Sequence, residues 1–434
     1  MYKIQVHDEK PNGTLILTPL INKNKIEEAR AAAEVHFSDL KDIKSYSGYF
    51  TVDELYNSNL FFWFFPSKYN YEDAPVILWL QGGPGASSMF GLFMENGPLE
   101  LLSNGTLKQR EHSWNNNHSI IYIDNPVGTG FSYTDGNGYL KNQTAIGDSL
   151  YEALLQFFKL FPELQKNDFF ATGESYGGKY VPAVSYSIHK NNPLSKQKIN
   201  LKGLAIGNGW SDPKNHLVRT DYLYQLGLID FKGKLQMGKQ ENITALYTQE
   251  KKWTKAAESE SQFFLLFNEY TGFDNIYNYL IPEYILIKNV TVLKDYLKNP
   301  NIKKAIHVGD APFSDLSGEV GSNLEEDIMK SVADWISELL DHYKVLFYNG
   351  QLDICVAYPL TRNFLQNLEF SGASQYKTAE RHQWHVDFEL AGYVKQAGNL
   401  TEIMVRDAGH MVPSDQPAWA LNMITRFTHN IPFY

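Results

Sequence analysis

Hydrophobic residues along this chain gather in short runs that alternate with amphipathic stretches, mainly between residues 45 and 210 and again between 330 and 434. Short apolar runs are typical of strands buried on both faces of a sheet, and the stretches between them read as helices. This alternation predicts an α/β protein with a central, mostly parallel mixed sheet and helices on both faces. Strands are expected at 48–52, 59–65 (an antiparallel pair with the first), 75–80, 119–124, 167–172, 201–207, 343–348 and 402–405.

Helices are predicted at 22–34, at 145–161 and after Lys179. Between about 210 and 320 the regular alternation fades into helical stretches rich in Lys, Glu and Tyr, such as 235–261, which indicates a cap over the sheet. The apolar run that follows this stretch is shorter than the roughly 18 residues that a membrane span needs, so we expect it in a cap helix.

These patterns predict a single domain with a core at about 40–209 and 321–434 and an inserted, largely helical cap at about 210–320. A chain of 434 residues is long enough to bury such a core. The formal charge of −10 argues against nucleic acid or an anionic membrane surface as the main partner. No apolar run approaches the length of a membrane span, so no membrane association is expected.

The chemistry of the chain is indicated first by the sequence Gly-Glu-Ser-Tyr-Gly at 173–177. This motif lies between a predicted strand and a predicted helix, where Gly-x-Ser-x-Gly forms a sharp turn that exposes the serine as a nucleophile. The two glycines remove side chains that would collide in such a turn. The motif arises by chance in about one of seven chains of this length, so Ser175 needs partners before it is assigned a role.

Asp353 and His410 supply the expected partners, because each follows a later predicted strand and their order after Ser175 is that of the α/β-hydrolase triad. His410 would take the proton of Ser175 and later protonate the leaving amine, while Asp353 would orient the imidazole and stabilise its charged form. Taken alone, Asp353 could be a turn carboxylate and His410 a packed loop histidine. Their positions after strands favour the catalytic interpretation.

An oxyanion intermediate requires backbone N–H donors, and the loop Gln-Gly-Gly-Pro-Gly at 81–85 directly follows a predicted strand. We assign the predicted oxyanion hole to the N–H groups of Gly83 and Tyr176. The spacing of the loop matches neither a dinucleotide fingerprint nor a phosphate-binding loop, so no nucleotide cofactor is expected. His382 and His385 stand at helical spacing but lack a third ligand, so no metal is expected either.

The compartment of the protein is indicated by conflicting features. Residues 1–8 lack the apolar segment of a signal peptide, and the single cysteine, Cys355, can form no internal disulfide. Sequons for N-glycosylation, in contrast, are roughly twice as frequent as chance predicts. We give the sequons more weight and expect a secreted or lysosomal/endosomal protein whose signal peptide is absent from this chain. The candidate glycosylation sites are Asn12, Asn104, Asn117, Asn142, Asn242, Asn289 and Asn399.

Three longer motifs occur in order along the chain: WLQGGPGASS at 79–88, GESYGG at 173–178 and GHMVP at 409–413. Together they resemble the serine carboxypeptidase family, and the likeness extends over nearly the whole chain. The vitellogenic-like branch of that family is the most similar, through the segments at 46–49, 59–65, 124–130 and 348–353.

The resemblance implies an α/β-hydrolase fold and the release of single residues from peptide or protein C-termini. Family members bind the free carboxylate of the substrate with residues that match Gln81, Gly82, Glu95 and Glu174 here. Two glutamates can accept a carboxylate only if at least one is protonated, because like charges at hydrogen-bond distance raise one pKa. An acidic preference with peptides is therefore implied. In isolation, Glu95 and Glu174 could be surface residues of a loop and a helix start.

Two departures from the family bear on these expectations. The family at large usually has Asn at the position of Gln81, although the vitellogenic-like branch shares Gln, and the longer stem shifts both polar atoms of the amide. Relatives often have Cys near Ala86 and further Cys in the cap, so here the cap lacks such disulfides. Cys355 follows Asp353 by two residues and either lines the pocket or is a small buried hydrophobe.

Two alternatives to a carboxypeptidase stay open from the sequence. The acyl-enzyme could pass its acyl group to an alcohol, as in some relatives, or a storage or protective binding protein could keep a triad that it does not use. The sequence specifies neither the preferred substrate side chains nor whether the chain forms a homodimer.

Overall fold

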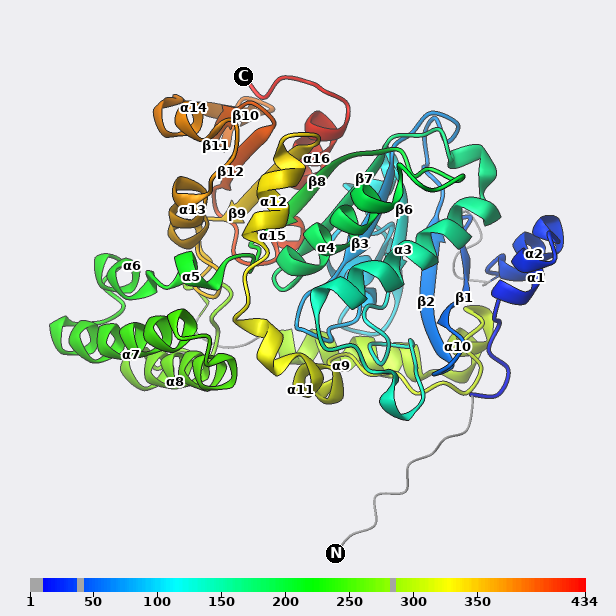
Figure 1. The fold of residues 1–434 in the computed structure, drawn as a ribbon, viewed down its shortest axis with the longest axis horizontal. Helices are drawn as coiled ribbons and strands as arrows, with labels where there is room; N and C mark the ends of the chain where they lie inside the picture. Colours follow the sequence, from blue (N-terminus) through cyan, green and yellow to red (C-terminus); the bar gives the residue numbers. More distant parts are fainter. Residues whose placement is uncertain (1–10, 37–42, 282–285) are drawn as a thin grey trace, which may run out of the picture.

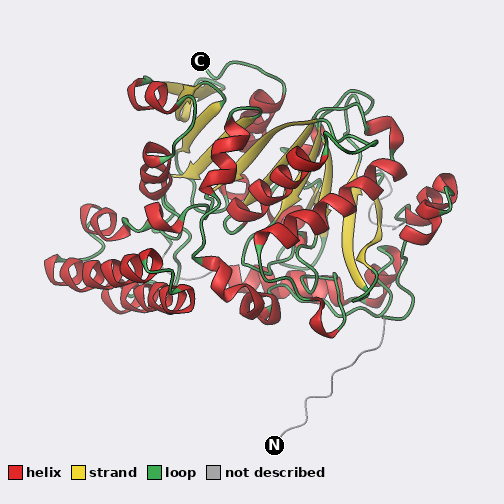
Figure 2. Ribbon diagram, viewed as in Figure 1, coloured by secondary structure: helices red, strands yellow, loops and turns green. Residues whose placement is uncertain are grey.

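A sheet of ten strands runs through the molecule in the computed structural model, which describes residues 11–36, 43–281 and 286–434 (Figures 1 and 2). The strand order is β1-β2-β6-β3-β7-β8-β9-β12-β11-β10. The strands from β6 to β12 in this order pair in parallel, and those beyond them at both edges pair antiparallel. The strands are β1 (Tyr46–Asp53), β2 (Ser58–Phe65), β3 (Val76–Leu80), β6 (Ser119–Ile123), β7 (Phe169–Glu174), β8 (Leu201–Gly207), β9 (Lys344–Gly350), β10 (Arg381–Val386), β11 (Glu389–Ala397) and β12 (Leu400–Val405), with β4 (Leu99–Leu101) and β5 (Leu107–Gln109) as a separate pair.

The predicted mostly parallel mixed sheet is confirmed, and every predicted strand is present in it. Strands β10 and β11 were not predicted, because edge strands bury few side chains: in β10 only Trp384 and Val386 are buried. The helical spacing expected for His382 and His385 is wrong, since both residues lie on strand β10. They are therefore not neighbours on one face of a helix.

The helices are α1 (Thr18–Asn22), α2 (Ile26–Ala33), α3 (Gln143–Leu160), α4 (Gly177–Asn191), α5 (Pro213–His216), α6 (Arg219–Gln225), α7 (Phe231–Gln249), α8 (Trp253–Thr271), α9 (Leu286–Lys298), α10 (Pro300–Ala305), α11 (Gly318–Ile328), α12 (Ala333–Leu340), α13 (Tyr358–Asn367), α14 (Ala373–Thr378), α15 (Val412–Asp415) and α16 (Pro417–Thr428). The helical stretch predicted at 235–261 is two helices, α7 and α8. Lys251 between them has a φ of 57°, a left-handed conformation that interrupts the helix.

Apolar side chains pack on both faces of the sheet. Along β3, Leu78 joins one apolar cluster, while Ile77 and Trp79 join another. Successive side chains of a strand point to opposite faces, so these two clusters lie on opposite sides of the sheet. Helices α3, α4 and α12 lie over one face (Figure 1), and residues of α3, α4 and α12 belong to the cluster of Leu78. Residues of α16 belong to the cluster of Trp79.

Between β8 and β9 the chain leaves the sheet and forms α5 to α12. Helices α7 and α8 lie side by side beyond one end of the sheet (Figure 1, lower left), and α12 returns to pack against α4 and β9. A small apolar cluster that includes Phe263, Phe267 and Ile354 joins α8 to the loop after β9. The segment predicted as a cap, 210–320, thus covers α5 to α10 and the start of α11. No helix of the described ranges is long and apolar enough to cross a membrane.

We predict that Gly147→Ala destabilises the protein by about 1–3 kcal/mol, because overpacking a close contact forces the backbone apart. A Cβ at Gly147 of α3 would lie 2.5 Å from the carbonyl oxygen of Ala183 in α4. The matched control is Gly321→Ala in α11, where a Cβ would meet no atom within 4 Å. Thermal unfolding should show a lower Tm for the first variant and no decrease for the second. Equal melting temperatures would contradict the packing argument.

Candidate active site

Ser175 stands at the reversal between β7 and α4. Its φ of 60° lies in the left-handed region, which residues other than glycine rarely adopt. The turn is held by the Ser175 N–H, which donates to Gly207 O at 3.0 Å, and by the Trp210 N–H, which donates to Ser175 O at 2.8 Å. Ser175 is partly exposed, whereas Glu174 and Tyr176 on either side are buried. The motif thus forms a sharp strand-to-helix turn that presents the serine.

The loop after β3 packs directly on this turn. A Cβ at Gly82 would lie 2.5 Å from the backbone nitrogen of Tyr176 and 2.7 Å from the carbonyl oxygen of Glu174. Any side chain at Gly82 would therefore displace the backbone on both sides of Ser175. Gly82 was predicted to bind the substrate carboxylate. In the structure, Gly82 lies against the backbone of the turn, so that the loop and the turn pack closely together.

Asp353 follows β9 and His410 follows β12, and the two side chains meet in the interior. His410 Nδ1 lies 2.8 Å from Asp353 Oδ2. The same carboxylate accepts hydrogen bonds from Asn208 Nδ2 at 2.8 Å, from the Val356 N–H at 3.1 Å and from the Cys355 N–H at 2.9 Å. An ionised carboxylate only accepts hydrogen bonds, so the proton of a neutral His410 sits on Nδ1 and leaves Nε2 as an acceptor.

His410 Nε2 is the atom that would take a proton from Ser175. It is buried and has no hydrogen-bond partner among the described residues, so no hydrogen bond joins it to the serine. Ser175 and His410 nevertheless line one cavity of about 500 Å³. Hydrogen bonds of this kind are often long in unliganded enzymes and tighten when substrate binds.

The two N–H groups predicted to form an oxyanion hole lie where the loop after β3 meets the turn. Within the described part of the chain, neither Gly83 N–H nor Tyr176 N–H donates a hydrogen bond to another residue. Gly83 lines the cavity. The Tyr176 hydroxyl donates to Asp327 Oδ2 at 2.8 Å, and Asp327 also pairs with the buried ammonium of Lys179 at 2.8 Å. These contacts fix Tyr176 beside the serine.

Gln81, Glu95 and Glu174 form a buried polar cluster at one side of Ser175. The amide Nε2 of Gln81 donates to Glu95 Oε1 and to Glu174 Oε1, each at 3.1 Å. Trp79 Nε1 donates to Gln81 Oε1 at 3.0 Å, which fixes the orientation of the amide. Glu95 is 0 % and Glu174 1 % exposed, so the alternative that they are surface residues is wrong. Glu95 ends a short π-helical turn, η2 (Gly91–Glu95), a feature often found at functional sites.

Burial makes these two carboxyl groups hold protons. Desolvation raises the pKa of Glu95 to about 7, and desolvation followed by the charge of Glu95 raises the pKa of Glu174 well above its usual value. A hydrogen bond between the two carboxyls lowers the pKa of Glu95 and raises that of Glu174, so Glu174 holds its proton more strongly. The Oε2 atoms of both are buried and receive no hydrogen bond from other described donors. A proton held between the two groups would satisfy them.

The cavity around Ser175 has walls from both parts of the chain. The core contributes Gln81, Gly83 and Glu174, and the segment between β8 and β9 contributes Tyr277 and Leu316, among others. Lys294 and Asp315 also line the cavity and form an ion pair of 2.9 Å. Cys355 lines it as well and is partly exposed, which agrees with the first of its two predicted placements. No group of three or more His, Cys, Asp or Glu in the described ranges could hold a metal ion.

Two neighbours of the candidate triad were not predicted from the sequence. Asn208 binds Asp353 and also accepts from the Gly350 N–H at 3.1 Å, and its place directly after β8 in a Gly-Asn-Gly turn could have signalled it. The ring of Tyr277 lies 4.9 Å from the His410 ring, and its carbonyl oxygen accepts from the His410 N–H at 2.8 Å. Tyr277 lies in an irregular segment without periodicity, so no sequence signal pointed to it.

The candidate glycosylation sites differ in their surroundings. Asn12, Asn104 and Asn242 are exposed. The Nδ2 atom of Asn117 donates to Thr425, and that of Asn399 donates to Leu340 O. The remaining two are Asn142, which is exposed and caps α3 through its side chain, and Asn289, whose side chain lies outside the described residues.

The buried glutamates should lower the stability of the protein as pH rises. Their pKa values are higher in the folded than in the unfolded state, so each stabilises the protein while protonated and loses that contribution as pH rises. The contribution of Glu95 is complete below about pH 4.5 and is lost as pH rises through about 7. For Glu95 the loss is roughly 3 kcal/mol. We predict that the double variant Glu95→Gln with Glu174→Gln loses less stability than the wild type between pH 5 and 8. Urea unfolding at both pH values measures this.

The control for this prediction replaces two exposed glutamates, Glu54 and Glu72, by Gln. It should keep the pH dependence of the wild type. If the buried double variant and this control depend on pH in the same way, the two buried carboxyls do not hold protons as described.

Comparison with known proteins identifies the family of the chain. A sequence profile of the serine carboxypeptidases matches residues 36–430. The venom serine carboxypeptidase of Apis mellifera is 52% identical over 99% of this chain and 93% of its own length. The vitellogenic carboxypeptidase of Aedes aegypti is 51% identical (96% and 90% covered), and the probable serine carboxypeptidase CPVL of Homo sapiens is 45% identical (96% and 89%).

Among solved structures, Kex1(delta)p, a prohormone-processing carboxypeptidase from Saccharomyces cerevisiae, matches with a TM-score of 0.83 at 24% identity, over 92% of this chain and 96% of that one. This match establishes the predicted α/β-hydrolase fold. Together with the profile and the curated relatives, it leads to one conclusion about identity: the chain belongs to the serine carboxypeptidase family and is a hydrolase.

Proposed function

We propose that the protein removes C-terminal residues from peptides through an acyl-enzyme formed on Ser175. In this mechanism His410 Nε2 takes the hydroxyl proton as Ser175 attacks the scissile carbonyl, and then gives it to the leaving amine. A water molecule then attacks the acyl-enzyme, with His410 taking its proton and returning it to Ser175, and the acyl group is released. Asp353 holds the imidazole with its proton on Nδ1. The supporting geometry is the 2.8 Å contact of His410 with Asp353 and the cavity that His410 shares with Ser175.

The N–H groups of Gly83 and Tyr176 would stabilise the oxyanion of the tetrahedral intermediate. Both N–H groups belong to backbone segments that pack closely at Gly82, so they need little reorganisation during the reaction. Loss of one such donor typically costs about 10²–10³ in rate. Their lack of acceptors among the described residues leaves both available to substrate.

Recognition of the C-terminal carboxylate is the feature that separates a carboxypeptidase from an esterase, and the cluster of Gln81, Glu95 and Glu174 supports it. When both glutamates are protonated, the cluster presents O–H and N–H donors and no net charge. A substrate carboxylate can then accept charge-assisted hydrogen bonds, which are stronger than neutral ones. This cluster beside Ser175, buried and able to hold protons, is the single observation that carries the proposal.

An acidic preference for peptides follows from the same cluster. As pH rises through about 7, Glu95 ionises, and the cluster then repels a carboxylate. We predict that kcat/KM for a peptide falls over this range mainly through KM. The same measurement with an ester that lacks a free carboxylate should not show this fall. In Glu174→Gln the pH dependence should weaken more for the peptide than for the ester. An equal pH dependence of both substrates in the wild type would contradict the assignment.

The reaction itself is tested by mass spectrometry of an N-terminally blocked peptide incubated at mildly acidic pH. We expect stepwise loss of residues from the C-terminus, no loss from the same peptide with a C-terminal amide, and no activity in Ser175→Ala. Equal cleavage of the amidated and free peptides would overturn the proposed carboxylate recognition. Products carrying an added alcohol would instead favour acyl transfer. Failure of a phosphonofluoridate probe to label folded Ser175 would favour a non-catalytic binding protein.

We further propose that the protein enters the secretory pathway and carries glycans at Asn12, Asn104 and Asn242. These side chains are exposed, whereas the Nδ2 atoms of Asn117 and of Asn399, which is also exposed, already donate hydrogen bonds at the atom to which a glycan would attach. Peptide mapping after enzymatic deglycosylation of protein from eukaryotic cells should find converted Asn at the first three sites. Occupancy at Asn117 and Asn399 with none at Asn12, Asn104 and Asn242 would contradict this assignment.

A further inference from the structure

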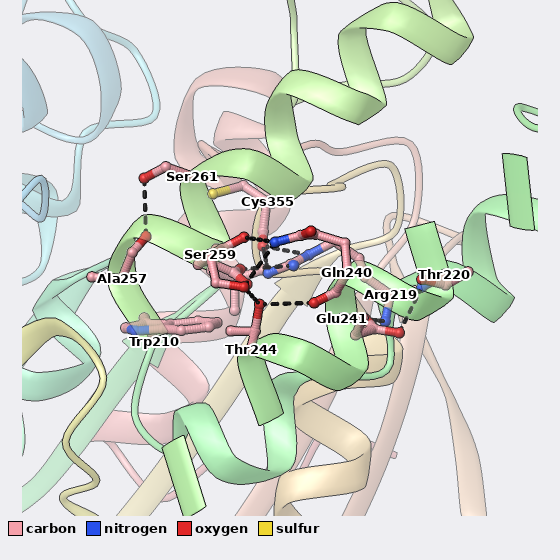
Figure 3. A network of polar contacts seen from close by, with 12 residues as sticks. Trp210, Arg219, Thr220, Gln240, Glu241, Thr244, Ala257, Ser259, Ser261 and Cys355 are labelled. Atoms are coloured by element: carbon pink, nitrogen blue, oxygen red, sulfur yellow. Dashed lines mark hydrogen bonds and ion pairs between the residues drawn. The ribbon is translucent and has the colours of Figure 1, made fainter. Parts of the chain in front are cut away.

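A buried arginine lies behind the loop that carries Asp353. Arg219 begins α6 and is 1 % exposed. Its Nε and Nη2 atoms both donate to the carbonyl oxygen of Cys355, at 3.2 and 2.9 Å. Figure 3 shows the guanidinium directed at the backbone of Cys355. Removing a cation from water costs free energy that its partners must offset, so the contacts of this guanidinium carry weight in the structure.

The carbonyl that Arg219 binds belongs to the peptide group between Cys355 and Val356. The N–H of this same peptide group donates to Asp353 Oδ2 at 3.1 Å. Asp353 Oδ2 is also the oxygen that contacts His410 Nδ1 at 2.8 Å. An unbroken series of hydrogen bonds therefore leads from the guanidinium through one peptide group to the carboxylate and on to the imidazole.

Two glutamates from the neighbouring helices contact Arg219, one at its guanidinium and one at its backbone N–H. Nη1 of Arg219 lies 2.9 Å from Glu260 Oε1 on α8, and the Arg219 N–H donates to Glu241 Oε1 on α7 at 2.5 Å. The rings of Phe263 and Phe264 lie 5.2 and 4.9 Å from the guanidinium carbon. The guanidinium is thus held on several sides and cannot easily turn away from the carbonyl.

We propose that Arg219 is a positioning residue for the triad, which acts by binding and polarising the Cys355–Val356 peptide group so that its N–H holds Asp353 Oδ2 in line with His410. This inference rests on the proposed roles of Asp353 and His410. A cation on a carbonyl oxygen makes the N–H of the same peptide a stronger donor, and the effect is larger in a low-dielectric interior. Removal of Arg219 should leave the carboxylate less firmly oriented.

The same contact gives the inserted helices a role in catalysis. The loop that carries Asp353 also donates from the Ile354 and Cys355 N–H groups to Ile276 O, at 3.0 and 2.9 Å. The insertion therefore binds this loop through two contacts: the backbone carbonyl of Ile276 and the guanidinium of Arg219. Because Cys355 is the only cysteine of the chain, no disulfide within the chain can supply this connection. Hydrogen bonds and a buried charge connect the insertion to the loop instead.

The test replaces the three charges together, in the variant Arg219→Met, Glu241→Gln and Glu260→Gln. Removing Arg219 alone would leave buried glutamates without a partner and could unfold the protein, whereas the triple variant leaves no uncompensated charge. Kinetics on a peptide substrate give kcat and KM separately. The proton NMR signal of His410 Nδ1–H, identified by its loss in His410→Ala, reports on the hydrogen bond to Asp353 without requiring activity.

We expect the triple variant to fold, to lose about 10- to 100-fold in kcat with little change in KM, and to show a displaced or exchange-broadened His410 Nδ1–H signal. The matched control is Ser259→Ala. Ser259 accepts from Gln240 Nε2 and contacts Thr244 Oγ1, each at 2.8 Å, so this change loosens α7 against α8 without touching Arg219 (Figure 3). The control should keep the kcat and the NMR signal of the wild type.

A triple variant with the kcat and the NMR signal of the wild type would overturn the inference, and so would an equal loss of kcat in Ser259→Ala. Failure of the proposed function would differ from both: the wild type itself would then release no C-terminal residues, and Ser175→Ala would change nothing.

Discussion

The close packing of backbone at Ser175 is the constraint on which the site depends. The chain reverses there with a left-handed serine, and the loop after β3 can lie against this turn only because Gly82 has no side chain. This contact sets the loop directly against three consecutive residues, Glu174, Ser175 and Tyr176, of which Glu174 and Ser175 line the cavity. The proposed nucleophile, carboxylate-binding residue and oxyanion donor are thus consecutive residues whose relative positions the backbone sets.

Burial then determines the electrostatics of each side of the site. On one side, Glu95 and Glu174 are buried, and the amide of Gln81 donates to both. Burial raises the pKa of each carboxyl group, which favours the protonated form that can donate a hydrogen bond. On the other side, Asp353 is equally buried, yet its carboxylate accepts hydrogen bonds from several N–H groups and contacts His410 Nδ1. The same fold thus surrounds one serine with buried carboxyl groups that have different hydrogen-bond partners.

Sequence patterns predicted the strands in the middle of the sheet, because strands such as β3 and β6 are buried on both faces and read as continuous apolar runs. Edge strands β10 and β11 bury too little to give that signal. Ser175, Asp353 and His410 could be selected because each directly follows a strand in the expected order. Asn208 also follows a strand, so its position offered a signal that was not used. Tyr277 and Arg219 gave none, since their importance arises from contacts with segments far away in the sequence. The pairing of Glu95 with Glu174 was implied by the family resemblance, and the structure supplies the burial that gives it physical meaning.

The central claim is that a substrate carboxylate binds to protonated glutamates. Calorimetric titration with a short peptide product, in buffers of different ionisation enthalpy, counts the protons taken up on binding. The account predicts uptake of about one proton per ligand near pH 8, where Glu95 is ionised in the free enzyme, and uptake approaching zero near pH 5. The same product with a C-terminal amide should take up none. Tight binding of the free carboxylate near pH 8 without proton uptake would contradict the account.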